Sequence, residues 1–294
     1  MLDFRPMTLG DYAWMKKLQE ASTQTACEYL PGNIYLWGEN HHTQVCRLNE
    51  DFFATYSEDK HCYCFPTGHG DYGTMFEALM RDANERGIAF RMFGVSEENR
   101  SMLEELFPGR FAYQENRDFA DYIYNAEDLI NLPGKKYHAK RNHIAAFLKS
   151  HRWEYKPLDE HNITGCVDFQ EHWFAANAAK NPGELAQENK VVLAALQNFF
   201  ALGFIGGVLY ADNAVAGFTI GERVNSEIFC THIEKADGAI RGAYPMLNQQ
   251  FAQNALAGYR FINREEDTGD EGLRRAKLSY YPAMTPAEFL AVMI

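Results

Sequence analysis

Residues 204–237 have the sequence FIGGVLYADNAVAGFTIGERVNSEIFCTHIEKAD, which contains three apolar runs separated by the polar segments ADNA and ERVNSE. Short runs rich in β-branched and aromatic residues, joined by turns that contain Asn, Asp and Ser, are typical of antiparallel strands. We therefore predict a three-stranded antiparallel meander. The surrounding pattern predicts two helices before it, near 161–179 and 184–202, and a helix, a strand and a final helix between 246 and 281.

The first part of the chain has a different order of elements. A short strand and an amphipathic helix, capped by Thr8 and starting near Leu9 or Asp11, are predicted first. Strand-like runs at 44–57 and 61–66 then precede a helical pattern at 71–87, a strand at 88–95, a helix at 96–107 and a strand at 110–125. A chain of 294 residues is long enough for two units of this size. We expect an α/β (α+β) protein with mixed central sheets flanked by helices, divided into domains 1–130 and 131–294. A basic helix at 135–151 leads the second domain.

The composition, with 46% hydrophobic and 23% charged residues, is that of an ordinary globular protein. Six cysteines without a CxxC pair, and an N-terminus without the features of a signal peptide, indicate free thiols, no metal site and a cytoplasmic location. One uncharged run, 191–211, has the length of a membrane span. Gln197, Asn198 and the glycines that follow divide it into a buried helix and a strand, so we predict no transmembrane segment.

Charge is unevenly distributed along the sequence. The net charge of −12 argues against non-specific coating of nucleic acid, yet no acidic residue occurs between Asp128 and Glu154. The predicted helix in this segment carries Lys136, Lys140, Arg141 and His143. These side chains indicate either a solvated helix face or a binding site for a polyanion, either tRNA or the phosphates of a donor or lipid headgroup.

Two glycine-containing loops could hold phosphate groups. GHGDYG, residues 68–73, fits the dinucleotide-binding pattern, but the carboxylate of Asp71 would occupy the place of a pyrophosphate, so a capped glycine-rich turn is favoured. DGAIRGAYP, residues 237–245, lies between a strand and a helix, where backbone N–H groups and the helix dipole favour an anion. The phosphate-binding candidates of this loop are Arg241, Gly242, Ala243 and Tyr244. An ordinary turn has the same composition.

The segment YRFINREEDTGDEGLRRAKLSYYP, residues 259–282, combines many opposed charges. In its helix, Leu273, Lys277 and Tyr280 share one stripe, so Lys277 should be buried and should need a carboxylate partner. The candidate partners are Glu265, Glu266, Asp267, Glu222 and Glu234. The acids at 265–267 either pair with the basic residues of the helix as a scaffold or face a cleft and select a cationic substrate.

Two residues of the third meander strand are candidates for proton transfer. His232 and Glu234 are two positions apart, so they share one face of the strand, and either could act as a general base towards an amine or hydroxyl. Tyr280 or Tyr281 could protonate a leaving group. A half-buried polar pair of His232 and Glu234 without a catalytic role is an equally good interpretation.

The motifs KKYHAKRNHIAAF, AGFTIGE, HIEKAD, RGAYPMLNQQFA and INREEDTGDEGLRRAKLSYYP resemble those of bacterial proteins related to the C-terminal domain of phosphatidylglycerol lysyltransferase. The resemblance covers nearly the whole chain and is densest over 133–282. It implies two GNAT-like domains in tandem, an architecture similar to that of the FemABX aminoacyl transferases. The lysyltransferases are anchored by membrane spans, so the resemblance does not carry phosphatidylglycerol over as the acceptor.

The resemblance implies transfer of an acyl or aminoacyl group from aminoacyl-tRNA or acyl-CoA to an amine or hydroxyl of a small molecule or lipid headgroup. Either donor would be a co-substrate rather than a tightly bound cofactor. Lys277 would contact the donor's phosphate or ribose, Glu234 or Glu222 would orient or deprotonate the acceptor, and Asn263 and Arg264 would shape the pocket. In the GNAT pyrophosphate loop, Ala239 and Tyr244 depart from the Q/R-x-x-G-x-G/A pattern. The alternative is a non-catalytic ligand-binding module on a GNAT-like scaffold.

Overall fold

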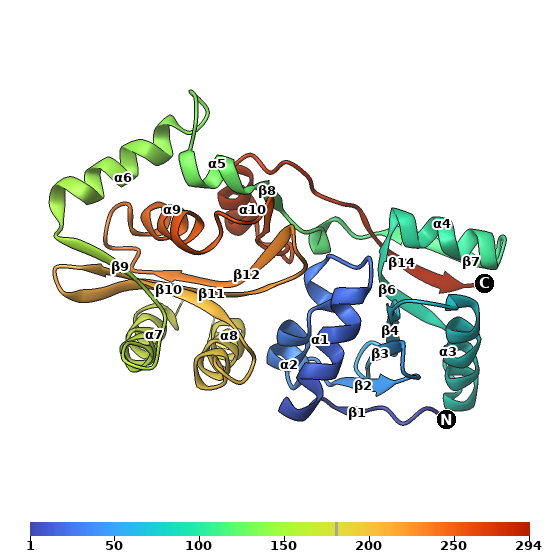
Figure 1. Ribbon diagram of the computed structural model, residues 1–294. Coiled ribbons are helices and arrows are strands. Elements are labelled where there is room, and N and C mark those ends of the chain that lie inside the picture. The colour runs from blue at the N-terminus through green and yellow to red at the C-terminus, as the bar shows by residue number, and fades with distance from the viewer. Residues whose placement is uncertain (180–181) are drawn as a thin grey trace. The chain divides into compact units, whose positions relative to one another are not determined.

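The computed structural model describes residues 1–179 and 182–294, whose contacts divide the chain into two compact units (Figure 1). Unit 1 comprises Met1–Tyr122, Glu265–Arg275 and Met284–Ile294, and unit 2 comprises Ile123–Arg264 and Ala276–Ala283. This division differs from the single boundary expected between residues 130 and 131. The difference arises because the C-terminal part of the chain returns to the first unit, which no local sequence signal indicated.

Unit 1 is built on a mixed sheet with the strand order β1-β2-β3-β4-β6-β14-β7, and β5 pairs with β3. Its strands are β1 (Arg5–Pro6), β2 (Thr43–Arg47), β3 (Phe52–Ser57), β4 (Cys62–Cys64), β5 (Thr67–Gly68), β6 (Arg91–Ser96), β7 (Phe111–Glu115) and β14 (Glu288–Met293). Its helices are α1 (Tyr12–Ala21), α2 (Pro31–Gly38), α3 (Tyr72–Arg86) and α4 (Glu97–Leu106), with the 3-10 turns η1 (Leu9–Asp11), η2 (Cys27–Tyr29) and η3 (Arg117–Phe119). Most of these elements match the predicted runs, whereas α2 and β14 were not predicted.

The helix α3 covers this sheet with an apolar face. Phe76, Leu79 and Ala83 recur at helical spacing and are buried in one core with Tyr63 and Met92 of the sheet. Burial of these large side chains supplies the main stabilisation of the unit.

The GHGDYG segment before α3 forms a capped turn, as the sequence favoured. Gly68 has a φ of 147°, and a Cβ atom there would lie 1.9 Å from the carbonyl oxygen of Asp51. The Asp71 side chain accepts a hydrogen bond of 3.2 Å from the N–H of Thr74, at the first turn of the helix. The glycine is therefore required by the close approach of the protein's own backbone.

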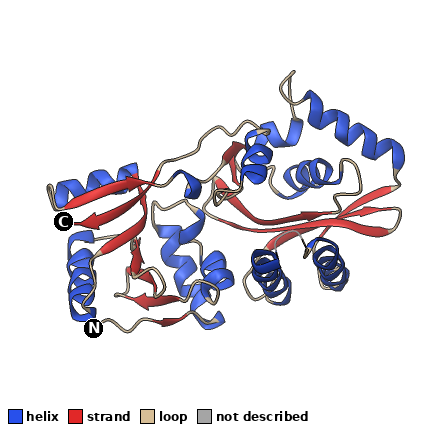
Figure 2. Ribbon diagram, turned by 180° about the vertical axis from the view of Figure 1, so that it is seen from behind, coloured by secondary structure: helices blue, strands red, loops and turns tan. Residues whose placement is uncertain are grey.

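Unit 2 is built on a sheet with the order β8-β13-β12-β11-β10-β9. Its strands are β8 (Ile123–Asn125), β9 (Trp153–Pro157), β10 (Ile205–Ala211), β11 (Ala214–Arg223), β12 (Ile228–Ala236) and β13 (Phe261–Asn263). Its helices are α5 (Ala126–Asn131), α6 (His138–Ser150), α7 (Ile163–Asn177), α8 (Pro182–Gln197), α9 (Ala243–Ala255) and α10 (Glu271–Leu278), of which α10 passes from unit 1 into unit 2. In the two ribbon views α7 and α8 cover one face of the sheet and α9 covers the other, with α6 beyond it (Figures 1 and 2).

The predicted meander is confirmed as β10, β11 and β12, which pair antiparallel in sequence order. Asp212 and Asn213 form the first turn with positive φ values of 52° and 69°, as a tight hairpin turn requires. In the β11–β12 ladder, Ile220 pairs with Ile233 whereas Gly221 pairs with Thr231, so His232 is an extra residue that bulges from β12. The bulge interrupts the simple alternation of side chains that the sequence suggested for His232 and Glu234.

The apolar run 191–211 is divided between the end of α8 and β10, as predicted. Across the described ranges, 1–179 and 182–294, we find no helix with the length and apolar character that a bilayer crossing requires. The stripe expected on the last helix is only partly buried: Lys277 and Tyr280 are 8% and 5% exposed, but Leu273 is 41% exposed.

We predict that Gly221→Ala will destabilise the protein by about 1–3 kcal/mol, the usual effect of inserting atoms into a well-packed site. A Cβ atom at Gly221 would lie 2.1 Å from the carbonyl oxygen of Cys230 and would force β11 and β12 apart beside the bulge. Chemical denaturation measures the change. Gly238→Ala is the matched control, because its Cβ would meet no atom within 4 Å. Equal losses in the two variants would contradict the steric account.

Candidate functional site

The candidate site lies where β12 and β13 separate. The two strands pair in parallel over three residue pairs, the last being Cys230 with Asn263. Beyond this point β12 continues to Ala236 and pairs only with β11. The chain leaves β13 at once, and Glu265 adopts a left-handed conformation with a φ of 57°. The side chains of Glu234 and Arg264 lie next to this opening.

Glu234 connects two polar side chains from different elements. Its Oε1 lies 3.0 Å from Arg264 Nη2, and its Oε2 accepts a hydrogen bond of 3.0 Å from Asn248 Nδ2 on α9. Among the residues that the structure describes, the buried atoms Arg264 Nη1 and Asn248 Oδ1 have no hydrogen-bond partner. Buried polar atoms normally have a partner, so these two are candidates for contact with a ligand. One is a donor and the other an acceptor.

A lysine and a tyrosine complete this cluster, which we call the Glu234 site: Lys140, Glu234, Asn248, Arg264 and Tyr280. Lys140 Nζ lies 3.8 Å from the centroid of the Tyr280 ring, and Arg264 Cζ lies 4.8 Å from the same centroid. Lys140 Nζ also donates a hydrogen bond of 2.7 Å to Ser279 Oγ. The aromatic ring stabilises both cations.

Burial, followed by the charge of Arg264, lowers the pKa of Lys140 to about 8, and the charge of Glu234 acts in the opposite direction. This lysine can therefore exchange a proton near neutral pH. Burial raises the pKa of the Tyr280 hydroxyl, so Tyr280 remains protonated. The Glu234 site thus offers a cationic donor, a neutral acceptor and a titratable amine.

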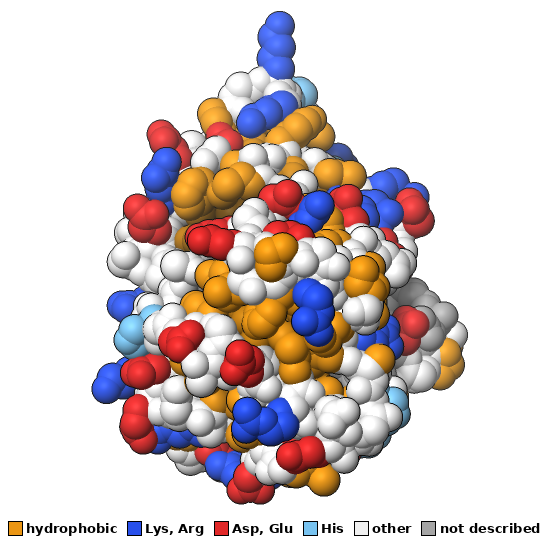
Figure 3. Space-filling view, turned by 90° about the vertical axis from the view of Figure 1, so that its right-hand side faces the viewer, with side chains coloured by type: hydrophobic (Ala, Val, Ile, Leu, Met, Phe, Trp, Pro, Cys, Tyr) orange, Lys and Arg blue, Asp and Glu red, His pale blue; other side chains and the backbone are white. Residues whose placement is uncertain are grey.

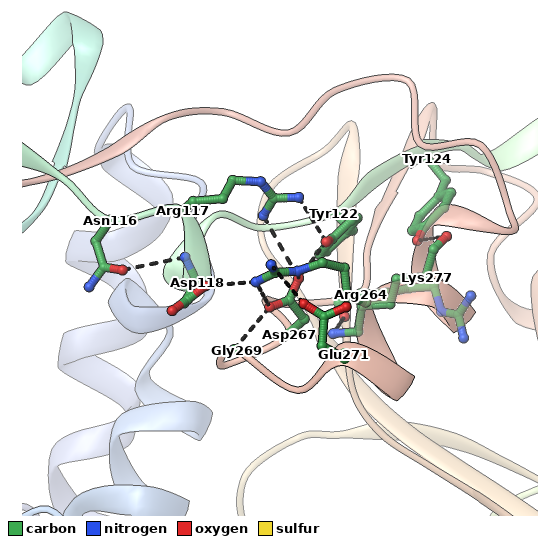
Figure 4. A network of polar contacts seen from close by, with 11 residues as sticks. Asn116, Arg117, Asp118, Tyr122, Tyr124, Arg264, Asp267, Gly269, Glu271 and Lys277 are labelled. Atoms are coloured by element: carbon green, nitrogen blue, oxygen red, sulfur yellow. Dashed lines mark hydrogen bonds and ion pairs between the residues drawn. The ribbon is translucent and has the colours of Figure 1, made fainter.

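Other predicted residues lie near this site and make contacts of their own. His232 Nε2 lies 3.1 Å from Glu222 Oε1, with the two side chains only 3% and 1% exposed. Lys277 Nζ donates a hydrogen bond of 2.7 Å to the backbone carbonyl of Arg264, while Tyr124 binds the carbonyl of Lys277 (Figure 4). Lys277 therefore positions Arg264. Asn263 is completely buried at the end of β13.

Packing requires the glycine in the loop before α9. Gly242 precedes the helix with a φ of 90°, and a Cβ atom there would lie 2.2 Å from the carbonyl oxygen of His143 on α6. Arg241 is exposed, Ala243 is buried, and Tyr244 is 36% exposed. Close packing between the two helices explains the glycine without a phosphate, so phosphate binding by this loop stays a prediction.

The basic segment around α6 has several distinct roles. Lys136 lies 3.5 Å from Asp128, and Arg141 donates hydrogen bonds to the backbone carbonyls of Leu132 and Gly134. His143 is exposed. Basic side chains are visible at the upper tip of the face in Figure 3, while acidic and basic side chains are interspersed over the rest of that face. Within the segment, Lys140 is the residue that joins the Glu234 site.

Of the acids at 265–267, Asp267 forms part of a scaffold in unit 1 (Figure 4). Asp267 is fully buried, and its carboxylate accepts hydrogen bonds from Arg274, Tyr122 and the N–H of Gly269 at 2.5–3.0 Å. Arg274 also lies 2.6 Å from Asp118. The hydrogen bond from Arg274 holds the pKa of Asp267 well below its usual range. Asp267 therefore acts in folding, and the backbone carbonyl of Glu265 accepts the N–H of Tyr122 nearby.

Sequence reasoning missed Asn248 and assigned Lys140 only to a polyanion surface. Asn248 is 6% exposed on the buried face of α9, among Met246, Leu247 and Phe251. A polar side chain within an apolar helix face is a signal that could have identified it. The position of Lys140 depends on contacts with residues far along the chain, which no local pattern contains.

Comparison with known proteins places the chain in a family. The family described as "Phosphatidylglycerol lysyltransferase, C-terminal" matches residues 20–292. The protein MYCGA3080 of Mycoplasmoides gallisepticum is 25% identical over 179 residues, which are 59% of this chain and 56% of that protein. The chain thus spans little more than half the length of this curated relative.

Solved structures share the fold over at least 90% of their length. A conserved protein of unknown function from Bacteroides thetaiotaomicron is 36% identical, with a TM-score of 0.94 and 100% coverage of both chains. L-PGS from Bacillus licheniformis is 12% identical, with a TM-score of 0.64 and coverage of 95% and 90%. A tandem GNAT protein of clavulanic acid biosynthesis is 11% identical, with a TM-score of 0.50 and coverage of 99% and 98%. The expected GNAT-like α/β fold is confirmed.

We predict that Asp267→Asn will lower the free energy of unfolding by about 2–3 kcal/mol, because it leaves Arg274 without its buried partner. The loss should be complete above the pKa of an unfolded aspartate, about 3.9, and should shrink as the pH falls below it. Denaturation at several pH values measures this. Glu271→Gln is the control, since Glu271 is 72% exposed and lies 3.8 Å from Arg274. A pH-independent loss would contradict the ion-pair account.

We predict that the rate at which Lys140 is acetylated by trace acetic anhydride will titrate with an apparent pKa of about 8. The physical reason is that burial and Arg264 favour the neutral amine, the nucleophilic form. Mass spectrometry of labelled peptides over a pH series gives the titration, with the exposed Lys149 as a reference for reagent decay. A Lys140 titration near the ordinary lysine value of about 10.4 would contradict the prediction.

Proposed function

Because the chain belongs to the family of phosphatidylglycerol lysyltransferase C-terminal domains, we propose that it transfers an aminoacyl group from an activated ester to an amine or hydroxyl at the Glu234 site. The carrying observation is the pair of buried atoms without a partner among the described residues, Arg264 Nη1 and Asn248 Oδ1, on either side of one carboxylate. Acyl transfer requires a donor for the carbonyl oxygen and an acceptor for the attacking nucleophile, and this pair supplies both.

The proposed chemistry is direct transfer without a covalent enzyme intermediate. The nitrogen or oxygen of the acceptor attacks the carbonyl carbon of the donor ester, and Asn248 Oδ1 orients it beforehand by accepting a hydrogen bond from its N–H or O–H. Arg264 Nη1 donates to the carbonyl oxygen, whose negative charge grows in the transition state. When the tetrahedral intermediate collapses, the bond from the carbonyl carbon to the ester oxygen breaks. Neutral Lys140 takes the nucleophile's proton and passes it to the leaving oxygen.

Glu234 positions both polar partners in this scheme. Its two oxygens fix the guanidinium of Arg264 and the amide of Asn248, so that the free atoms keep their orientation before substrate arrives. Lys277 restrains the backbone of Arg264 in the same way. The transfer rate should increase as the pH approaches about 8, where Lys140 loses its proton.

We propose aminoacyl-tRNA as the donor rather than acyl-CoA. Two observations support this choice. First, packing against α6 explains Gly242 in the loop 237–245, so this glycine is no evidence for the pyrophosphate of acyl-CoA. Second, the acid-free segment that carries Lys136, Lys140 and His143 adjoins the site. A cationic segment suits the phosphates of tRNA. The acceptor is a small-molecule or lipid-headgroup amine or hydroxyl, placed against Asn248 by its hydrogen-bonding group.

The test is a transfer assay with a radiolabelled aminoacyl-tRNA pool and a panel of amine and hydroxyl acceptors, with acetyl-CoA in a parallel arm. Arg264→Lys keeps the positive charge but loses the second guanidinium nitrogen, Nη1, which is the proposed oxyanion donor. The value of kcat should therefore fall by about 10²–10³, the usual effect of removing such a donor. Glu234→Gln should also lower kcat, because it loosens Arg264.

Glu227→Gln is the matched control for these variants, because Glu227 is exposed in the turn between β11 and β12. Thermal unfolding of every variant separates loss of folding from loss of chemistry. Transfer from acetyl-CoA but not from aminoacyl-tRNA would show that acyl-CoA is the donor. Binding of one ligand without product in any arm would favour the non-catalytic ligand-binding module.

A further inference from the structure

Unit 1 contains a second cluster of polar groups that the transfer chemistry does not use. The 3-10 turn η2, the segment before β8, the chain after β13 and the start of β14 bring together Cys27, Glu28, Asp121, Glu266 and Glu288. We call these five residues the Cys27 cluster. Cys27 Sγ lies 3.1 Å from Glu266 Oε2 and 3.9 Å from Glu28 Oε2, and the N–H of Cys27 donates a 2.9 Å hydrogen bond to Asp121 Oδ2.

The spacing of three members suits a single ion. One ligand atom each of Cys27, Glu28 and Asp121 can be chosen so that all lie within 4.8 Å of one another. Two ligands on opposite sides of an ion, each about 2.0–2.4 Å from it, are separated by a similar distance. The three atoms could therefore contact one ion with small side-chain movements.

Glu288 is an independent sign of a missing ligand. It is only 5% exposed, and in the described part of the chain its Oε2 atom has no hydrogen-bond partner. The charges of Asp121 and Glu266 act on the Glu288 carboxylate, so the three carboxylates lie near one another. A buried carboxylate oxygen near further carboxylates requires a cation or a shared proton.

The backbone opposite the cluster leaves room for Glu28. Gly94 on β6 has a φ of 70°, and a Cβ atom at this position would lie 2.9 Å from Glu28 Oε1. A larger residue would push the carboxylate away. The glycine thus permits the position that Glu28 occupies beside Cys27.

We propose that Cys27, Glu28 and Asp121 bind a divalent metal ion, Zn²⁺ or Mn²⁺, with Glu288 and Glu266 as the further carboxylates of the site. Two positive charges compensate the crowded carboxylates better than one. A thiolate together with carboxylate oxygens is a ligand set that suits these ions better than Mg²⁺. The ion joins segments that are far apart in the sequence, so it stabilises unit 1 and does not enter the transfer reaction.

The test uses the full-length protein after treatment with a chelator and desalting. Titration with Zn²⁺ and with Mn²⁺, followed by elemental analysis, should give one ion per chain, and the thermal unfolding midpoint should rise. Glu28→Gln and Glu288→Gln should each weaken binding by about tenfold or more. Both variants should also raise the midpoint of the metal-free protein, because an amide avoids the cost of desolvating or protonating a carboxylate in a buried cluster. A carboxylate that only stabilised the fold would not combine weaker metal binding with a higher midpoint of the metal-free protein when it is replaced.

Glu105→Gln, an exposed carboxylate on α4, is the matched control and should change neither the affinity nor either midpoint. Absence of a bound ion in the chelator-treated protein at saturating Zn²⁺ and Mn²⁺ would overturn the proposal. Equal affinity in wild type and Glu28→Gln would also overturn it. If spermidine stabilised the protein and neither metal did, the cluster would bind an organic ammonium group, and the metal proposal would be wrong. Failure of the transfer assay leaves these outcomes unchanged.

Discussion

The early end of the pairing between β12 and β13 is the constraint on which the proposed site depends. After the pair Cys230 and Asn263 the strands no longer share hydrogen bonds, so backbone alone cannot fill the space between them. An ion pair between Glu234 and Arg264 lies there instead, with the side chains each 13% exposed. Such a half-buried pair needs further partners to offset the cost of removing charge from water. Asn248 provides one, and we propose that Arg264 Nη1 and Asn248 Oδ1 contact the substrate.

The surrounding residues keep this opening in a fixed geometry. The bulge at His232 lets β12 bend beside the site, while the buried contact of His232 with Glu222 occupies the next polar positions. Lys277 holds the backbone of Arg264, and Tyr280 lies against both cations. In unit 1, the buried ion pair of Asp267 and Arg274 fixes the chain before it reaches Lys277. In the proposed mechanism, folding and chemistry thus use different members of the charged segment 259–282.

The parts of the fold with strong local signals could be predicted from sequence. The meander has tight turns with Asn and Asp, and α3 has an apolar stripe and a capping aspartate, so both followed from short patterns. β14 could not be predicted in this way, because it is defined by insertion between β6 and β7. The same distinction applies to the site. Glu234 and Arg264 were identified by residue type and resemblance, whereas the roles of Lys140 and Asn248 depend on long-range packing.

The most direct measurement is a crystal structure of the protein with a non-hydrolysable aminoacyl-adenosine, in which an amide replaces the ester. The account predicts that the acyl carbonyl oxygen lies within hydrogen-bond distance of Arg264 Nη1, with the reactive carbon between this atom and Asn248 Oδ1. An analogue bound away from Glu234, with both of these atoms still without a ligand, would contradict it.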